Sequence, residues 1–427
     1  MNDRKMRYRI FAPEEMIEDG VVELPLSKSL STRALIMDAL TADAPAENRA
    51  SVAVCDDTAL MEAALEKGAG KIDVGASGAA LRFLTAYFAA KDGCEVELHG
   101  TERLHERPMG ILVDALRECG AEIEYLEKEG FAPLRVRGRQ LRGGEVTVDV
   151  TVSSQFVSAL LMVAPLMDEG LTVRFEGEPV SLPYILMTTG MMEQRGIAVD
   201  REPLRVKVAR GDYRPFRQAA EGDWSAAAFW YEISALTAGW ITATNLKADT
   251  LQGDKAAAKY FECLGVLTMP SEEREGAIEL TPSPEVYGRL DLDLTDNPDL
   301  APALAVTCCL IGVPFKFTGL RGLGIKECDR LQAVCDEMDK LGRVVEKIRD
   351  YGLEWEGKNH PVTEMPVFDA HNDHRMAMAL APVSVYVPGI VIEGCEAVSK
   401  SYPGYWDQLR GIGFRVEDAD TETDTEE

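Results

Sequence analysis

The stretch MGILVDALRECGAEIEYL, residues 109–126, joins an amphipathic helix pattern to a glycine and a short strand pattern. Its apolar residues recur at helical spacing as far as Leu116, and Gly120 follows four positions later. Glycine just past a helix adopts a left-handed backbone without a Cβ clash, and it therefore commonly ends the helix. The run around Ile123 then favours a strand. This stretch predicts a helix–turn–strand unit.

The same pattern occurs six times along the chain. The glycines that would end the six helices are Gly68, Gly120, Gly196, Gly265, Gly342 and Gly413. The copies recur every fifty to eighty residues, which is too wide a spacing for a solenoid. The 427 residues suffice for two or more domains. We therefore predict an α/β protein with three units in each half and a hinge near residues 217–229. A single domain of this length is the alternative.

The overall charge is strongly acidic, at −27 with 46% hydrophobic residues, as in a soluble globular protein. Such a body repels nucleic acid, so positive charge for an anionic ligand must be gathered locally. The acidic tail, residues 417–427, is predicted to be disordered. Nine cysteines without CxxC spacing indicate reduced thiols. With no apolar run of membrane length and no signal-peptide pattern, we expect a cytoplasmic protein that binds no membrane.

Basic and hydroxyl residues gather at the predicted helix start in LPLSKSLSTRALIMDAL, residues 24–40. Lys28, Ser29 and Arg33 lie where free N–H groups and the helix dipole favour an anion. A well-capped surface helix is the simpler alternative. The GxxxxGK[ST] pattern of a nucleotide P-loop is absent.

Two further stretches join small or extended backbone to arginine. In DVGASGAALRFLTAYFAA, residues 73–90, small residues around Gly78 would let backbone N–H groups approach a phosphate closely. Tight helix packing, with Arg82 in a structural ion pair, explains the same pattern. Arg107 precedes a proline and must be extended, so its guanidinium can face a cleft or solvent.

A strand that ends in serines precedes the helix pattern of TVSSQFVSALLM, residues 151–162. Ser153, Ser154 and Gln155 could form a neutral phosphate cradle at the helix start, or Ser153 could be a plain cap. Ser181 and Tyr184 of SLPYIL are arranged alike one unit later.

Acidic and basic residues mix at two later helix starts. Asp299 comes just before the apolar helix pattern of residues 300–306. Lys326 and Arg330 are four apart, on one face beside Glu327. Two cations at a helix start oppose the macrodipole, which indicates a bound anion. An ordinary salt-bridged helix, with pairs Lys326–Asp329 and Glu327–Arg330, is the alternative.

Histidines and acids crowd the stretch FDAHNDHRMAMALAPVSVYV, residues 368–387. A metal site, a helix cap and an anion site are all compatible with His371, His374 and their acidic neighbours. A metal would need further ligands, and the other histidines lie in unrelated contexts. Arg375 lies at the start of an apolar helix pattern, which predicts an anionic partner for its guanidinium. Lys400 precedes the sixth helix.

Six motifs in order resemble the EPSP synthase (3-phosphoshikimate 1-carboxyvinyltransferase) family of enolpyruvyl transferases, over residues 20 to 410. They are SKSLSTRAL, SSQF, SLPY, IKECDRL, DHRMAM and SKSYPGYW. The resemblance implies two domains of three βαβαββ units each, of the inside-out α/β barrel type, at residues 27–220 and at 1–26 with 221–427. It also implies transfer of the enolpyruvyl group of phosphoenolpyruvate to the 5-hydroxyl of shikimate 3-phosphate, in the shikimate pathway, without metal or organic cofactor. We expect a monomer.

The resemblance also implies a role for each matching residue. Asp299 would take the proton from the 5-hydroxyl and Glu327 would protonate the methylene carbon, with Lys28 as a further catalytic residue. Phosphoenolpyruvate would be held by Lys28, Gly78, Arg107, Lys400, Arg330 and Arg375, the last two on its carboxylate. Shikimate 3-phosphate would be held by Ser153, Ser154, Ser181 and Lys326 at its phosphate, Ser29 and Arg33 at its carboxylate, and Gln155 and Tyr184 at its ring.

The chain departs from the usual family signature at four positions. GASGAALRFL replaces a sequence close to GNAGTAMRPL, so that Ala76, Ala79 and Phe83 stand for asparagine, threonine and proline. Gly324 stands where an arginine is common. These changes affect the phosphoenolpyruvate side, where the herbicide glyphosate binds in this family against the glycine that matches Gly78.

Two other functions are compatible with the same scaffold. A sister family transfers enolpyruvyl to UDP-N-acetylglucosamine through a loop cysteine, whereas Cys119 lies in a helix-end pattern. A non-catalytic binding protein is suggested by Ala76 and Ala79, and Asp299 and Glu327 argue against it. Phosphate release would separate an enzyme from a binding protein.

Overall fold

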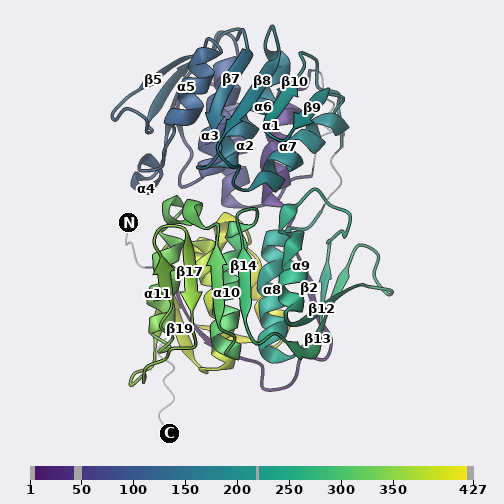
Figure 1. Ribbon diagram of the computed structural model, residues 1–427, viewed down its shortest axis with the longest axis vertical. Helices are drawn as coiled ribbons and strands as arrows, with labels where there is room; N and C mark the ends of the chain where they lie inside the picture. The colour runs from purple at the N-terminus through teal and green to yellow at the C-terminus, as the bar shows by residue number, and fades with distance from the viewer. Residues whose placement is uncertain (1–4, 43–50, 218–220, 421–427) are drawn as a thin grey trace. The chain divides into compact units, whose positions relative to one another are not determined.

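The computed structural model describes residues 5–42, 51–217 and 221–420, and Figure 1 shows their helices and strands. The chain forms two compact units. Unit 1 comprises residues 1–25, 221–250 and 254–427, and unit 2 comprises residues 26–220 and 251–253. The chain thus begins in unit 1, forms unit 2 and then continues in unit 1. Residues 251–253 again belong to unit 2, which the sequence did not indicate.

Unit 2 contains two four-stranded sheets of the same topology, β3-β4-β6-β5 and β7-β8-β10-β9. The first two strands of each are parallel, and the other neighbours are antiparallel. Helices follow the first two strands, which gives the order βαβαββ. The strands are β3 (Gly70–Asp73), β4 (Glu95–His99), β5 (Glu122–Tyr125), β6 (Leu134–Arg137), β7 (Gly144–Asp149), β8 (Leu171–Glu176), β9 (Val199–Glu202) and β10 (Arg205–Val208).

The helices of unit 2 supply most of its core. They are α1 (Lys28–Ala39), α2 (Asp56–Lys67), α3 (Gly78–Ala90), α4 (Glu102–His105), α5 (Gly110–Glu118), α6 (Ser154–Val163) and α7 (Leu182–Gln194). Every residue of α6 except Gln155 is buried, and α6 packs against both α3 and α7. Strands such as β7 alternate buried and exposed residues, so each sheet covers the helices with one face and meets solvent with the other.

Unit 1 contains three more sheets with this topology. Their orders are β2-β11-β13-β12, β14-β15-β17-β16 and β18-β19-β1-β20. The strands are β1 (Arg7–Phe11), β2 (Gly20–Glu23), β11 (Ile241–Thr244), β12 (Leu264–Pro270), β13 (Ile278–Val286), β14 (Leu290–Asp293), β15 (Phe315–Thr318), β16 (Glu346–Ile348), β17 (Gly352–Trp355), β18 (Val367–Asp369), β19 (Ile390–Glu393) and β20 (Arg415–Asp418).

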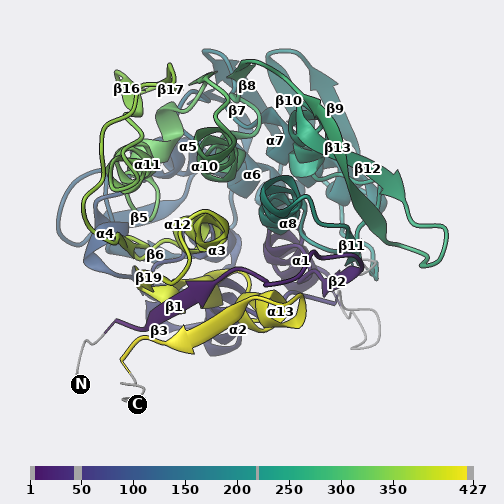
Figure 2. The same cartoon turned by 90° about the horizontal axis from the view of Figure 1, so that it is seen from below.

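The two N-terminal strands complete sheets built from later parts of the chain. β2 pairs in parallel with β11, and β1 lies antiparallel between β19 and β20. Figure 2 shows purple β1 between these yellow C-terminal strands. The predicted α/β fold of two similar units is confirmed. Among the described residues five βαβαββ copies are complete, and α1 and α2 form the remaining part of unit 2.

The helices of unit 1 are buried in the same way. They are α8 (Trp224–Thr237), α9 (Ala257–Glu262), α10 (Ala301–Ile311), α11 (Arg330–Asp339), α12 (His374–Leu380) and α13 (Tyr405–Gly411). All residues of α12, and all but the last of α10, are buried. None of the helices in the described chain is both long and apolar enough to cross a bilayer.

The six glycines that defined the sequence pattern all adopt positive φ. Five follow the end of a helix, as predicted. Gly265 does not, because α9 ends at Glu262 and Gly265 lies inside β12 at a bulge between Leu264 and Val266. Gly68 differs in another way. It leads into β3, the first strand in the order of its sheet, whereas the other four glycines that follow helices lead into the last strand of that order, β5, β9, β16 or β20.

The prediction that the whole segment 417–427 is disordered is wrong at its start. Glu417 and Asp418 belong to β20, where they pair with Arg9 and Tyr8 of β1. Asp420 also lies 3.2 Å from Arg7. Basic residues of β1 offset the acidic charge that suggested disorder. Residues 421–427 lie outside the described chain.

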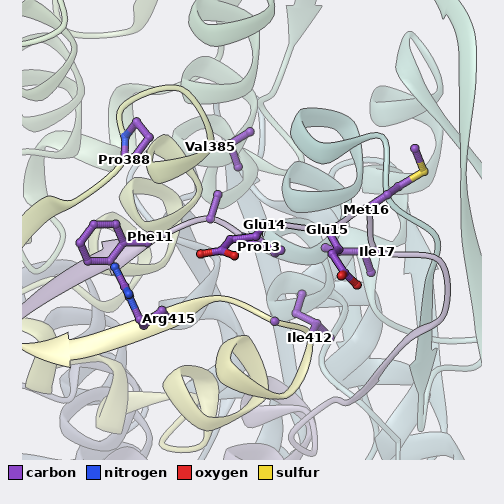
Figure 3. Close-up of a pocket in the computed structure, with 12 residues that line it drawn as sticks. Phe11, Pro13, Glu14, Glu15, Met16, Ile17, Val385, Pro388, Ile412 and Arg415 are labelled. Atoms are coloured by element: carbon purple, nitrogen blue, oxygen red, sulfur yellow. The ribbon is translucent and has the colours of Figure 1, made fainter.

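A surface cavity of about 780 Å³ lies in unit 1, beside the loop that follows β1. Figure 3 shows Phe11, Pro13 and Ile17 of this segment facing Val385, Pro388 and Ile412. The guanidinium of Arg415 lies 4.0 Å from the centre of the Phe11 ring at one end. Its lining includes none of the predicted site residues.

Candidate active site

Arg330, the first residue of α11, lies among three carboxylates of unit 1. Its Nη1 donates to Asp299 at 2.7 Å and its Nη2 to Glu327 at 2.9 Å. Its Nε donates to Asp373 at 2.7 Å. Burial by itself lowers the pKa of this guanidinium, but the three carboxylates outweigh burial and raise the pKa well above its usual value. Arg330 therefore stays charged and holds three acids around one point.

Helix starts bring these groups together. Asp373 caps α12 by accepting from the Arg375 N–H at 2.9 Å, and Asp329 caps α11 by accepting from the Gln332 N–H at 3.1 Å. Asp299 lies in a 3₁₀ turn, η4 (Pro298–Leu300), directly before α10. The N-termini of helices carry partial positive charge. The arrangement therefore favours anions at this cluster.

Asp299 contacts three cations. Besides Arg330, its carboxylate lies 3.2 Å from Arg375 Nη2 and 3.5 Å from Lys326 Nζ. Burial by itself raises the pKa of Asp299, but Arg375, Lys326 and Arg330 together outweigh burial and lower this pKa below its usual range. Asp299 is therefore ionised, and any anion that took its arginine partners would raise its pKa.

Glu327 shares Arg330 with Asp299 and also lies 3.6 Å from Lys400 Nζ. Lys400 is the last residue of a 3₁₀ helix, η7 (Cys395–Lys400), and is buried. The cluster thus contains four cations and three carboxylates. They are Lys326, Arg330, Arg375 and Lys400 with Asp299, Glu327 and Asp373.

The structure contains one of the two predicted ion pairs of residues 326–330. Lys326 precedes α11, so the prediction that Lys326 and Arg330 share one helical face is wrong. The ordinary Glu327–Arg330 pair is present at 2.9 Å. Lys326, however, lies against Asp299, and Asp329 pairs with Lys347 at 3.0 Å. The cations of this segment are thus held around Asp299.

His371 and His374 serve different neighbours. His371 Nε2 lies 2.8 Å from Glu337, and His374 Nδ1 lies 3.7 Å from Asp373. Across residues 5–42, 51–217 and 221–420, no group of three or more His, Cys, Asp or Glu side chains is placed to hold a metal ion. The stretch supplies a helix cap and places Arg375 beside Asp299.

In unit 2, Lys28 and Ser29 open α1, but Ser27 is the cap, with its Oγ accepting from the Leu30 N–H at 3.4 Å. Lys28 Nζ pairs at 3.0 Å with Asp57, a buried residue in the first turn of α2. Asp57 was not identified from the sequence. Its only signal there is an acidic residue in the first turn of the next helix.

Arg33 is buried, and its partners are neutral oxygens. Its Nε donates to Thr188 at 2.7 Å, and its Nη1 donates to the carbonyl of Ser29 at 2.9 Å. The guanidinium lies over the rings of Phe83 and Tyr184, 5.3 and 5.8 Å from their centres. Burial lowers the pKa of Arg33 to about 10. A carboxylate ligand would compensate this buried charge.

Gly78 begins α3, and Ser77 caps the helix by accepting from the Ala80 N–H at 3.2 Å. A Cβ at position 78 would lie 2.6 Å from Arg107 Nη1 and 2.7 Å from Arg82 Nη1. With any other residue at this position, one or both guanidiniums would have to shift away from the helix start. The structure therefore brings Gly78 and Arg107 together, and it adds Arg82.

Gln155 contacts Arg82, and its side-chain oxygen accepts from Arg82 Nη1 at 2.7 Å. Ser153 caps α6 and accepts from the Gln155 N–H at 3.3 Å, so Ser154 is the first helical residue. A plain cap is thus part of the arrangement, as the simpler interpretation predicted. The same turn joins Gln155 to the group around Gly78.

Ser181 precedes α7 with φ 55° and makes no capping hydrogen bond through its side chain. A left-handed backbone is uncommon for serine, and such conformations are often found at functional sites. Tyr184, one turn later, accepts from Arg33 Nη2 through its carbonyl at 3.4 Å. Arg33 thereby links α1 to this helix start.

The predicted site residues divide between the two units. Unit 2 holds Lys28, Ser29, Arg33, Gly78, Arg107, Ser153, Ser154, Gln155, Ser181 and Tyr184. Unit 1 holds Asp299, Lys326, Glu327, Arg330, Arg375 and Lys400, all in the cluster around Arg330.

Comparison with known proteins gives a consistent result. The family model of EPSP synthase (3-phosphoshikimate 1-carboxyvinyltransferase) matches residues 56–409. A 3-phosphoshikimate 1-carboxyvinyltransferase of Bacteroides fragilis is 45% identical, over 96% of this chain and 99% of that protein. One from Methanospirillum hungatei is 33% identical, over 91% and 94%. The solved EPSP synthase of Acinetobacter baumannii has the same fold, with a TM-score of 0.75 at 20% identity over 96% and 100% of the two chains.

Proposed function

The chain belongs to the EPSP synthase (3-phosphoshikimate 1-carboxyvinyltransferase) family, and on this basis we propose which of its residues perform the enolpyruvyl transfer. The reaction joins the enolpyruvyl group of phosphoenolpyruvate to the 5-hydroxyl of shikimate 3-phosphate and releases phosphate. It is a step of the shikimate pathway to aromatic amino acids. Each of the residues to which we assign a role belongs to one of the two units.

The observation that supports these roles best is the cluster around Arg330. Both substrates carry several negative charges, and the net charge of the chain is −27. The cluster gathers four cations in this acidic protein. Arg330 and Arg375 present guanidiniums that suit bidentate binding of the phosphoenolpyruvate carboxylate. Lys400, in the same cluster, would contact its phosphate.

Asp299 and Glu327 divide the two proton transfers. Addition to the double bond requires a base for the 5-hydroxyl and an acid for the methylene carbon. Elimination then removes a proton from the new methyl group and supplies one to the departing phosphate. Asp299 is ionised and is the base. When the phosphoenolpyruvate carboxylate takes Arg330 and Arg375, Asp299 loses partners that lower its pKa, and it becomes a stronger base. Glu327, beside Lys400, is the acid.

The unit 2 residues hold shikimate 3-phosphate in this proposal. Ser153 and Ser154, at the start of α6, and Ser181, before α7, would bind its phosphate through hydroxyl and N–H groups. Arg33 with Ser29 would bind its carboxylate, and Gln155 and Tyr184 would lie against its ring. Lys326 is assigned to the phosphate by the family pattern, although in the structure it pairs with Asp299.

The residues around Gly78 would contact the phosphate of phosphoenolpyruvate. Lys28 and Arg107 supply charge to its phosphate, and the α3 start supplies N–H groups. Ala76 and Ala79 remove two polar side chains that the usual signature places here, while both guanidiniums beside Gly78 are present. Charge, rather than side-chain amide or hydroxyl contacts, would dominate binding of this phosphate.

The setting of the enzyme is also proposed. All nine cysteines are free thiols, as expected for a protein of the reducing cytoplasm. We propose that it works there as a monomer, with no cofactor.

Phosphate release from phosphoenolpyruvate tests the proposed function. Release that requires shikimate 3-phosphate is expected. Release that requires UDP-N-acetylglucosamine instead would establish the sister activity. Tight binding of shikimate 3-phosphate without any release would identify a non-catalytic binding protein.

A further inference from the structure

Asp254 is a buried carboxyl, 2% exposed, that connects two parts of unit 1. Its Oδ1 accepts from Asn297 Nδ2 at 3.1 Å. Its Oδ2 accepts a hydrogen bond from the hydroxyl of Ser225. Asp254 lies in a 3₁₀ turn, η3 (Gly253–Ala256), and outside the six motifs that carry the family resemblance.

Asn297 holds the turn that carries Asp299. It is buried and precedes η4, in which Asp299 is the second residue. Its backbone N–H donates to the Leu294 carbonyl at 3.0 Å, and its carbonyl accepts from the Leu300 N–H at 3.1 Å. The backbone is therefore fixed on both sides of Asn297. Its side chain amide is fixed by Asp254.

The other partner of Asp254 is anchored independently. Ser225 is the second residue of α8, and its N–H donates at 2.8 Å to Asp223, the cap of that helix. Asp254 thus ties the η4 turn to the start of the buried helix α8. Asp254 is also the first residue of unit 1 after residues 251–253, which belong to unit 2.

We propose that Asp254 is a positioning residue for Asp299 and acts through the Asn297 side chain. In the structure Arg330 and Arg375 hold the Asp299 carboxylate, but in the proposed function the phosphoenolpyruvate carboxylate takes both arginines. The short 3₁₀ turn that carries Asp299 then needs another restraint if the carboxylate is to stay directed at the 5-hydroxyl. The Asp254–Asn297 hydrogen bond is such a restraint. Since a displacement of about 1 Å can cost about a hundredfold in rate, the restraint acts on kcat.

This inference rests on the proposed role of Asp299 as base. Asp254→Ala is expected to lower kcat for phosphate release by about tenfold or more and to change KM for shikimate 3-phosphate by less than about threefold. Asp254→Asn is expected to restore kcat to within about threefold of wild type, because its amide oxygen accepts from Asn297 and its amide N–H₂ donates to the Ser225 oxygen.

A double-mutant cycle separates positioning from general damage to the fold. Asn297→Ala removes the same hydrogen bond from its other end and should cause the same loss. If Asp254 acts through Asn297, the double variant loses no more kcat than either single variant. Losses that multiply, or wild-type kcat in Asp254→Ala, would overturn the proposal.

Two controls complete the experiment. Ser225→Ala removes the other hydrogen bond of Asp254 and should cost less kcat than Asp254→Ala, and an equal or larger cost would count against action through Asn297. If Asp254→Ala does not fold, Asn297→Ala with Asp254→Asn supplies the same comparison. Asp299→Asn tests the role of Asp299 as base separately from the role of Asp254 in positioning it. If Asp299→Asn keeps wild-type turnover, the proposed base is wrong. If only Asp254→Ala keeps it, only this inference fails.

Discussion

The guanidinium of Arg33 lies over the ring of Phe83, with 5.3 Å between Cζ and the ring centre. Phe83 stands where the family signature commonly has proline. In the structure Phe83 is buried, and the ring faces a buried cation. The substitution therefore supports Arg33, through an interaction that proline could not provide.

Phe83→Leu should raise KM for shikimate 3-phosphate by about two- to thirtyfold and leave kcat nearly unchanged. The reason is that a cation–π interaction contributes about 0.5–2 kcal/mol at a partly desolvated site, and Arg33 is assigned to the carboxylate of this substrate. Steady-state kinetics at saturating phosphoenolpyruvate measures the effect. Phe88→Leu, on the same helix and equally buried, is the matched control for packing. Equal changes of KM in the two variants would show that packing alone is responsible.

Asp299→Asn and Glu327→Gln should each reduce turnover by roughly a hundredfold or more, the usual size of a general acid–base contribution. Binding of shikimate 3-phosphate, measured by calorimetry, should change little, because neither carboxylate is assigned to hold it. Asp329→Asn is the control. Asp329 is only two residues from Glu327, but it caps α11 and pairs with Lys347. Wild-type turnover in Asp299→Asn or Glu327→Gln would contradict the assigned role.

Glu232→Gln should stabilise the protein at neutral pH. Glu232 in α8 is fully buried, and neither carboxyl oxygen has a hydrogen-bond partner among the described residues. Burial raises its pKa well above the usual value, so the folded state binds a proton that the unfolded state has released. The penalty is absent below the unfolded pKa of about 4.3 and grows as pH rises from there toward the folded pKa.

Urea unfolding at several pH values measures this effect. The free energy of unfolding of Glu232→Gln minus that of wild type should be larger at pH 7.5 than at about pH 4.5. Glu337→Gln is the contrasting control, because Glu337 is equally buried but contacts His371 and Lys340, and its loss should destabilise. A difference for Glu232→Gln that does not depend on pH would show that this carboxyl is not protonated in the folded state.

The fold could be predicted because each repeat carries local signals. Helical spacing and glycine ends identified five of the helix–strand junctions, and Gly265 was misplaced because a bulge and a helix end both require positive φ. The cations of the site could be located by their odd positions at helix starts. The neighbouring sequence could not decide whether these cations form salt bridges within the chain or bind an anion. Arg330, for example, contacts both nearby Glu327 and Asp299, which is 31 positions away.

The site residues that could not be identified from the sequence are those whose partners lie far away along the chain. Asp57 pairs with Lys28, and Asp254 pairs with Asn297, across 29 and 43 positions. Nothing in the neighbouring sequence distinguishes either acid from a solvated surface residue. The start of the acidic tail was misjudged for the same reason, because the basic residues that pair with it are at the other end of the chain.

The position of β1 between β19 and β20 affects how the protein is made on the ribosome. Unit 2 is complete once residue 253 has left the ribosomal tunnel. β1 is synthesised long before its partners β19 and β20, and unit 1 therefore closes only after these two strands have left the tunnel. We expect nascent chains halted before residue 390 to contain a folded unit 2 and an incomplete unit 1 in which β1 lacks its strand partners and is open to chaperones.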